Sequence, residues 1–310
     1  MMSVVVEPEA FSRACFDVPE YKLQVELFLK GIISNGLLIT DEGDVLLREM
    51  SRHLETLPTS CGQRISTIFT DLVKEYKNES ELRKKIVACP ALPPPQHAAE
   101  NLSLAARLAD AYRADALAAS TSNVCPSRNR TDPLELTHYQ ESQFEEKRRY
   151  FRESFPLVNE IGRDGLKDAL IRSMRFSRWL RFYDKEIGKG NNTPGFRKGL
   201  SFIVGLWARH AQFRKEVVEI FTLDGGTTKG YLEDKLVKPL RRDHHLDVRL
   251  EMKRSEGSDF HERYMQTETA VLKFGRGFDL FDRDGNLKEN AIEIRDTDHE
   301  HLSKWRQLSE

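Results

Sequence analysis

Stretches that favour strands alternate with stretches of helical periodicity along most of this 310-residue chain, and this alternation limits its fold more than any other feature. In the first third, β-branched and aliphatic runs predict strands at residues 3–8 and 36–40. Apolar residues spaced three and four apart predict helices at 20–34, 45–54 and 65–76. Strands and helices that alternate in this way predict an α/β fold.

The second half of the chain repeats the alternation. Strands are predicted at residues 179–184, 217–222 and 248–252, and a long helix opens at Thr193, where threonine is a good N-cap and proline follows it. Strands separated by helices pair in parallel through right-handed crossovers, and sites in such sheets lie at the loop-bearing ends. The last strands are expected at residues 264–274 and 292–294. We expect an α/β domain with a mixed sheet.

Length and local composition divide the chain. A chain of 310 residues suggests two domains. Residues 121–133 are rich in Ser, Asn, Arg and Pro, and we interpret them as the interdomain linker. The sequence therefore predicts a small N-terminal α/β domain at residues 1–120 and a second domain at 134–310.

Charge and cysteine usage restrict the possible partners and the compartment. With 48 basic and 49 acidic residues the net charge is -1, so any site for an anion must be a local patch. The four cysteines form no Cys-x-x-Cys pair, which favours a reducing compartment and no zinc site. The chain shows no signal-peptide pattern at its start and no apolar run of about 20 residues. We expect a cytoplasmic protein without a transmembrane segment.

The strongest chemical signal lies between Phe260 and Phe281. His261 and Arg263 are two residues apart, so in an extended segment their side chains share one face. An imidazole beside a guanidinium suits phosphate, because the guanidinium binds phosphate oxygens and the imidazole can attack or transfer a proton. The alternative is a surface turn ahead of a buried aromatic strand, with no chemical role.

The spacing of four residues in this segment resembles the phospholipase D superfamily motif His-x-Lys-x4-Asp-x6-Gly. Arginine stands in place of the lysine and glutamate in place of the aspartate. The matching residues are His261, Arg263, Glu268 and Gly275. Two further blocks agree in order, around Asp184 and around Phe196, although the first of them lacks the expected proline and tyrosine.

Residues 150–310 as a whole are similar to the phospholipase D-like C-terminal domain of microtubule-interacting-and-trafficking domain proteins. That branch carries Lys-x-Gly-Arg-Gly-Leu-Asp-x-Phe, and this chain has a closely similar run from Lys273 to Phe281. The branch includes stand-alone bacterial relatives, which suggests a role in defence against phage or mobile DNA. Its eukaryotic members resemble modules that bind membranes and partner proteins.

The resemblance implies specific roles at the site. His261 would be the nucleophile or the acid, Arg263 the phosphate clamp and Glu268 a support. The residues expected to help bind phosphate are Lys273, Arg276 and Asp184. The superfamily's chemistry requires no cofactor, but it uses two histidine motifs and this chain has one. An active nuclease would therefore need a homodimer.

Two functions remain open from the sequence. One is a phosphodiesterase that cleaves nucleic acid through His261. The other is a non-catalytic adaptor that binds anionic partners or other proteins in a complex. Arg263 in place of the lysine favours this second function, because arginine differs from lysine in geometry and hydration.

The N-terminal domain faintly resembles PIN-like ribonuclease domains, through the strand before Glu7, the strand at 36–40 and the helix that bears Glu49. PIN-like domains hold Mg²⁺ or Mn²⁺ with carboxylates at strand ends. The resemblance implies a metal site of Glu7 and Glu49 with Glu100 or Asp115. The alternative is a solvated acidic surface.

Two smaller patterns have ordinary interpretations. His244 and His245 indicate an exposed pair rather than a ligand set. The run from Asp282 to Asn286 resembles the start of a calcium loop but lacks the glutamate at loop position twelve, so it predicts a hairpin turn.

Overall fold

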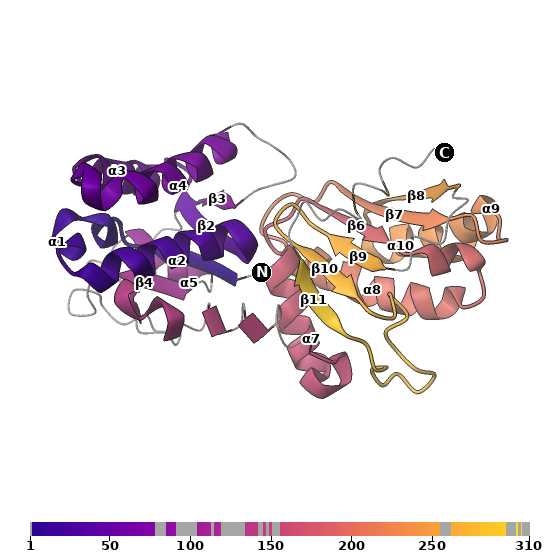
Figure 1. Cartoon of the computed structure of the whole chain (residues 1–310). Coiled ribbons are helices and arrows are strands. Elements are labelled where there is room, and N and C mark those ends of the chain that lie inside the picture. Colours follow the sequence, from indigo (N-terminus) through magenta and orange to yellow (C-terminus); the bar gives the residue numbers. More distant parts are fainter. Residues whose placement is uncertain are drawn as a thin grey trace, which may run out of the picture. The chain divides into compact units, whose positions relative to one another are not determined.

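The computed structural model describes two compact units, Met2–Arg149 and Tyr150–Glu310, each with its own sheet (Figure 1). The described residues are 2–77, 85–90, 104–112, 115–118, 134–141, 145–146, 149–150, 156–254, 262–295, 302 and 305. Each unit combines helices and strands, which confirms the predicted α/β class. No helix within these ranges is long and apolar enough to cross a membrane.

The N-terminal unit is built on a parallel sheet with the strand order β3-β2-β1-β4-β5. Its strands are β1 (Met2–Val6), β2 (Gly36–Asp41), β3 (Ile86–Cys89), β4 (Asp115–Ala118) and β5 (Leu134–Glu135). Strand β2 is buried along its whole length, as expected for a parallel strand that is covered on both faces. The strand order reverses beside β1, which is where α/β sheets open a crevice at their carboxyl ends.

Amphipathic helices surround this sheet. The four longest are α2 (Pro19–Asn35), α3 (Val45–Glu55), α4 (Thr59–Lys77) and α5 (Leu104–Tyr112), and the short ones are η1 (Pro8–Phe11), α1 (Arg13–Phe16) and η3 (Leu136–Glu141). Helix α3 buries Leu46, Leu47, Met50 and Leu54 on one face. This is the three- and four-residue spacing from which the helix was predicted.

The boundary between the units lies later than the sequence predicts. Strand β5 pairs with β4, and Tyr139 packs edge-on against Phe28 with ring centroids 5.5 Å apart. Residues 134–149 therefore belong to the N-terminal unit and not to the second domain, because their apolar groups complete the first core. The predicted linker, residues 121–133, lies outside the described residues.

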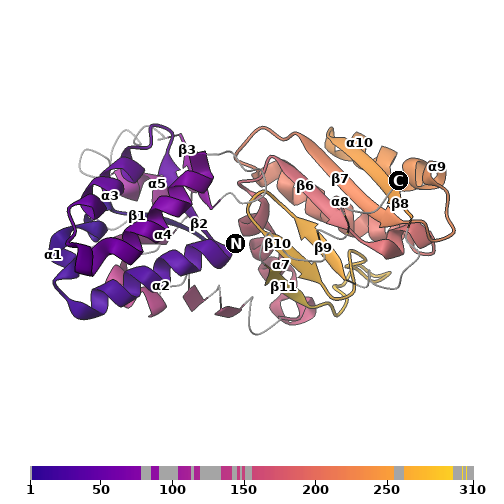
Figure 2. The ribbon, with the colours of Figure 1, turned by 45° about the horizontal axis from the view of Figure 1, so that its top comes forward.

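The C-terminal unit has a mixed six-stranded sheet with the order β11-β10-β9-β6-β7-β8. Strands β6 (Trp179–Tyr183), β7 (Val217–Leu223) and β8 (Asp247–Lys253) run parallel, as predicted. Strands β9 (Arg263–Gln266), β10 (Val271–Phe274) and β11 (Ile292–Arg295) are antiparallel to their neighbours. The sheet is seen from two directions in Figures 1 and 2.

The single strand predicted at residues 264–274 is wrong, because a tight turn divides it into β9 and β10. The hydroxyl of Thr267 accepts hydrogen bonds from the N–H groups of Thr269 and Ala270, at 3.2 and 2.8 Å, and these bonds stabilise the reversal of the chain. The turn contains neither glycine nor proline, so the usual signals of a turn do not mark it in the sequence. The hairpin turn predicted at Asp282–Asn286 is confirmed: the N–H of Asp282 donates to the carbonyl of Asn286, and Gly285 has a φ of 91°.

Helices cover one face of the C-terminal sheet, with α8 packed beside α7 and α10 (Figures 1 and 2). The helical elements are α7 (Val158–Met174), η4 (Lys185–Lys189), α8 (Thr193–His210), α9 (Lys229–Leu232), η5 (Glu233–Val237) and α10 (Lys238–His244). Gly199 of α8 lets the helix approach the chain at Phe278, whose carbonyl oxygen would lie 1.8 Å from a Cβ at this position. The other face buries Tyr183 and Tyr264 with Leu302 and Trp305.

An ion pair between a buried carboxylate and a partly exposed arginine joins the β9–β10 turn to the start of β6. The carboxylate of Glu268 is 1% exposed and accepts two hydrogen bonds from the Arg178 guanidinium, at 2.7 and 3.0 Å. It also accepts the Arg178 backbone N–H at 2.7 Å. Arg178 has a second, exposed partner, Glu216, at 3.5 Å.

Replacing Glu268 with glutamine should lower the unfolding free energy of the C-terminal unit by about 3 kcal/mol, because the Arg178 guanidinium then faces an amide that cannot accept all three bonds. The matched control is Glu216→Gln, which removes the exposed partner of the same arginine and should cost less than about 1 kcal/mol. Urea unfolding followed by tryptophan fluorescence measures both variants. All three tryptophans, at 179, 207 and 305, lie in the C-terminal unit, so the signal reports on it alone. Equal costs would contradict the assignment.

Candidate phosphate site at one edge of the C-terminal sheet

Three segments that are far apart in the sequence meet at one edge of the C-terminal sheet. Strand β6 ends at Tyr183 and leads into Asp184, while the antiparallel strand β9 begins there with Arg263. Strand β10 ends beside the start of β9, where Phe274 pairs with Arg263 and leads into Gly275. Antiparallel pairing therefore brings Asp184, Arg263 and the glycine turn together. His261 lies outside the described residues.

Asp184 is held at this edge by hydrogen bonds to both its side chain and its backbone. Its side chain is completely buried, and its Oδ1 accepts the N–H of Glu186 at 2.9 Å while its Oδ2 accepts the N–H of Phe278 at 3.4 Å. Its backbone is held as well, because the hydroxyl of Thr222 donates to its carbonyl at 2.8 Å. The carboxylate thus connects the end of β6 to the segment that follows the glycine turn.

Arg263 reaches towards this carboxylate without being fully paired. Its Nε lies 3.7 Å from Asp184 Oδ1, and its Nη2 lies 3.9 Å from a carboxylate oxygen of Glu186. Its Nη1 donates to the carbonyl of Gly275 at 3.0 Å. The Nε is buried and has no hydrogen-bond partner among the described residues. The guanidinium is therefore positioned by the protein and is 22% exposed, but its buried Nε is closed to a ligand, so any further hydrogen bond must come from its Nη atoms.

The glycine turn has to approach this pair closely. Gly277 has a φ of 77°, in the left-handed region that favours glycine. A Cβ at this position would lie 2.2 Å from Asp184 Oδ2 and 3.3 Å from Arg263 Cγ. Only glycine fits, so the Gly-x-Gly pattern of the sequence has a steric cause at its second glycine.

Burial controls the protonation of Asp184. Removal from water raises the pKa of its carboxyl group to about 7, although the N–H groups of Glu186 and Phe278 and the charge of Arg263 act in the opposite direction. The carboxyl group therefore changes its charge near neutral pH. Because it is buried behind Arg263, its role is to position the arginine rather than to contact a ligand.

Glu268, predicted as a support for catalysis, does not belong to this edge. It lies in the turn after β9, at the opposite end of that strand from Arg263, and its carboxylate binds Arg178. The spacing of the motif is the same as in the superfamily pattern, but here it spans the length of a strand. Glu268 therefore stabilises the hairpin and does not contact the site.

The structure turns one predicted phosphate-binding residue, Lys273, away from Arg263. Lys273 pairs with Tyr264 across the hairpin and so points to the opposite face from Arg263, where it forms an ion pair with Glu262. Arg276 follows the edge but is exposed, and its backbone N–H donates to Asn290 at 2.8 Å. Of the three predicted phosphate ligands, only Asp184 contacts Arg263. Glu186, which sequence reasoning missed, lies two residues beyond the predicted strand end.

The predicted metal site of the N-terminal unit is described only in part. Glu7 follows β1 directly, while Glu49 lies on α3 and pairs with Arg52 at 2.5 Å. Glu100 and the side chain of Asp115 lie outside the described part of the chain. Among the residues that are described, no three carboxylate, histidine or cysteine groups gather to hold a metal ion. The metal site remains a prediction.

Asp41 is the carboxylate that sequence reasoning overlooked in the N-terminal unit. It ends β2 and accepts the N–H groups of Val45 and Leu46 at the start of α3, both at 3.0 Å. Burial favours its neutral form, but these backbone bonds outweigh burial and hold its pKa below the ordinary value. Its position directly after the strand predicted at residues 36–40 is the feature of the sequence that could have identified it.

Comparison with known proteins finds no family model that matches this sequence and no curated protein with significant similarity to it. The likeness to the phospholipase D superfamily therefore rests on the residues themselves.

The raised pKa of Asp184 predicts how stability changes with pH. An aspartate titrates near pH 4 when unfolded and here near 7, so the folded state binds the extra proton between these values. The unfolding free energy should therefore fall as pH rises from 4 to 7, by up to about 4 kcal/mol relative to Asp184→Asn. Urea unfolding of both proteins at several pH values measures the difference. Parallel profiles would show that folding does not raise the pKa of Asp184.

Proposed function

We propose that the C-terminal unit is a phosphodiesterase that binds the backbone of a nucleic acid at Arg263 and cleaves it through His261. The observation that carries this proposal is the incompletely paired Arg263 guanidinium, which a buried carboxylate and a glycine turn hold at the edge of the sheet. Arginine binds phosphate oxygens through paired donors, and a preorganised cation lowers the energy of the transition state at phosphorus.

The reaction follows from histidine chemistry. A nitrogen of His261 attacks the phosphorus, so a P–N bond forms while the bond to the leaving oxygen breaks. A second, protonated histidine gives its proton to that oxygen. Water then attacks the phosphohistidine, the P–N bond breaks, and the second histidine takes a proton from the water. No metal ion is needed at this site.

A homodimer would supply the second histidine. One motif per chain leaves the site without its acid, and a two-fold axis through the site would place the His261 of another copy opposite the first. This part of the proposal rests on the resemblance, as does the assignment to bacterial defence in the cytoplasm.

A non-catalytic adaptor is the second candidate, and a specific observation favours it. The Arg263 guanidinium already lies near two carboxylates and donates to the Gly275 carbonyl, which weakens its attraction for phosphate. In this role the same edge would bind an anionic partner, such as a protein of a larger complex, without turnover.

The N-terminal unit supports a separate, metal-dependent candidate. Its parallel sheet places Glu7 at the carboxyl end of the strand where the strand order reverses, which is the usual position of a site in such folds. We propose Glu7 and Glu49 as ligands of Mg²⁺ or Mn²⁺ in a PIN-like ribonuclease site. Cleavage that requires the metal and is lost in Glu7→Ala would support this assignment.

Activity in EDTA distinguishes the candidates. With labelled DNA and RNA strands as substrates, we expect turnover in EDTA that falls about a hundredfold or more in His261→Ala, because the nucleophile is gone. A similar fall is expected in Arg263→Gln, because the phosphate loses its clamp. Denaturing gels measure the cleavage, and an acid-labile covalent link between the labelled strand and the trapped protein reports the phosphohistidine.

The controls are His210→Ala and Arg214→Gln, two exposed residues of the same unit that should leave activity unchanged. Cleavage that survives in His261→Ala would refute the mechanism. Strand binding without turnover, lost in Arg263→Gln, would establish the adaptor. Light scattering should show a dimer at the assay concentration, and a monomer that is fully active would contradict the composite site.

A further inference from the structure

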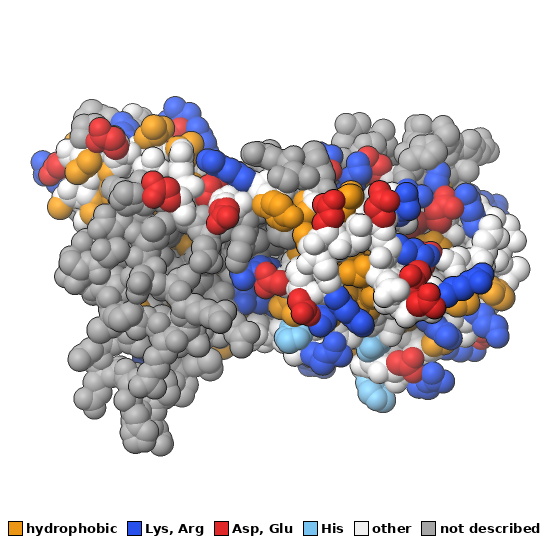
Figure 3. All heavy atoms as spheres, turned by 90° about the horizontal axis from the view of Figure 1, so that it is seen from below, with side chains coloured by type: hydrophobic (Ala, Val, Ile, Leu, Met, Phe, Trp, Pro, Cys, Tyr) orange, Lys and Arg blue, Asp and Glu red, His pale blue; other side chains and the backbone are white. Residues whose placement is uncertain are grey.

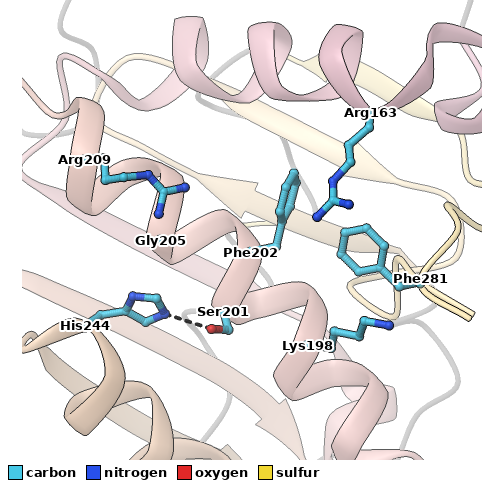
Figure 4. A pocket seen from close by; sticks show the side chains of 9 residues that line it. Arg163, Lys198, Ser201, Phe202, Gly205, Arg209, His244 and Phe281 are labelled. Carbon is cyan, nitrogen blue, oxygen red and sulfur yellow. Dashed lines mark hydrogen bonds between the residues drawn. The ribbon is translucent and has the colours of Figure 1, made fainter. Parts of the chain in front are cut away.

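A groove of about 360 Å³ runs along the outer face of α8, away from the edge that holds Arg263. Five of its lining residues come from α8 at the spacing of a single helical face: Lys198, Ser201, Phe202, Gly205 and Arg209. Arg163 reaches in from α7 and His244 from α10, on either side of α8 (Figure 4). The volume is within the range of ligand sites.

The groove is strongly basic. Arg163, Lys198 and Arg209 line it, and no lining residue is acidic. Within the part of the chain that the structure describes, none of these three cations lies within 4.0 Å of a carboxylate oxygen, whereas most other cations of α7 and α10 do. In the surface view, Lys, Arg and His side chains lie along the lower rim of the C-terminal unit, with acidic side chains among them (Figure 3). Because the whole chain has a net charge of -1, this is a local concentration of charge.

Aromatic rings hold two of the cations in place. The Arg163 guanidinium lies 5.6 Å from the ring centroids of both Phe202 and Phe281, and the Lys198 ammonium lies 5.5 Å from that of Phe281. Lys198 also donates to the carbonyl of Asp282 at 3.2 Å. Cations fixed in this way lose less conformational entropy when they bind a ligand.

The groove also contains polar groups from α8 and α10. Gly205 leaves room for the His244 ring, whose Cε1 would lie 3.0 Å from a Cβ at that position. His244 Nε2 forms a 2.9 Å hydrogen bond with the Ser201 hydroxyl. Burial lowers the pKa of His244, so near neutral pH the ring is an uncharged hydrogen-bonding group between the cations.

We propose that this groove binds the sugar–phosphate backbone of a single nucleic-acid strand. Lys198 and Arg209 are eleven residues apart on α8, which is about 16 Å along the helix axis, so the charges are too widely spaced for one phosphate. A chain that carries a phosphate on every nucleotide matches a line of cations, and two of the three are arginines, whose planar donors suit phosphate.

The groove is independent of the proposed cleavage site, because it shares no residue with the Arg263 edge and concerns binding alone. Its test uses His261→Ala in every protein, so that the strand is not consumed. A labelled strand of ten thymidine nucleotides is titrated in EDTA and followed by fluorescence anisotropy. Lys198→Gln with Arg209→Gln should weaken binding tenfold or more.

The same double variant should also reduce the slope of log K against log salt by about 1.4, which is about 0.7 for each lost contact with a single strand. The matched control is Arg197→Gln with Arg214→Gln, which removes two exposed cations outside the groove, one of them on α8 itself, and should change affinity less than twofold. The same fold-changes in affinity should be measured when Arg263 is also replaced by glutamine, whether or not the protein cleaves nucleic acid.

Three results would overturn the proposal. The first is an equal loss of affinity in the groove variant and in the control. The second is displacement of the strand by a ten-residue polyglutamate as readily as by an unlabelled strand, which would indicate an acidic protein partner. The third is displacement by thymidine monophosphate as effectively per nucleotide as by the strand, which would indicate a site for one nucleotide.

Discussion

A single buried carboxylate, Asp184, determines the arrangement of the C-terminal site. It is completely buried, and the N–H groups of Glu186 and Phe278 together with the charge of Arg263 only partly offset its loss of hydration. A buried charge without partners is unfavourable, so a conformation that moved these N–H groups or Arg263 away from the carboxylate would be less stable. The end of β6, the start of β9 and the glycine turn after β10 therefore meet at one point.

The hairpin of β9 and β10 is anchored at both ends by ionic contacts that have different roles. At the turn, Glu268 is sealed from water and pairs closely with Arg178, which is a stabilising contact. At the open end, Arg263 stays 3.7 Å or more from its carboxylate neighbours and keeps donor capacity. Tight pairing at one end holds the strand, and loose pairing at the other leaves a cation available to a ligand.

Much of the secondary structure could be predicted, because it follows from local patterns. The hairpin turn near Gly285 agrees with the sequence analysis, as do strands β1, β2, β6, β7 and β8, since apolar alternation and turn chemistry act over a few residues. The division of residues 264–274 into two strands was missed, because a threonine hydroxyl makes that turn without glycine or proline. The unit boundary was missed because β5 finds its partner in β4.

The sequence by itself determined that the chain is α/β, that Arg263 stands just ahead of a strand, and that no overall charge attracts an anion. These properties depend on residue type and spacing. Only the tertiary structure decided which residues share a site. Antiparallel pairing brought Asp184 to Arg263, sent Lys273 to the opposite face and left Glu268 at the far end of the strand. The basic groove also arose only through helix packing, because its cations come from two helices, α7 and α8, whose contact is specified by the fold and not by distance along the chain.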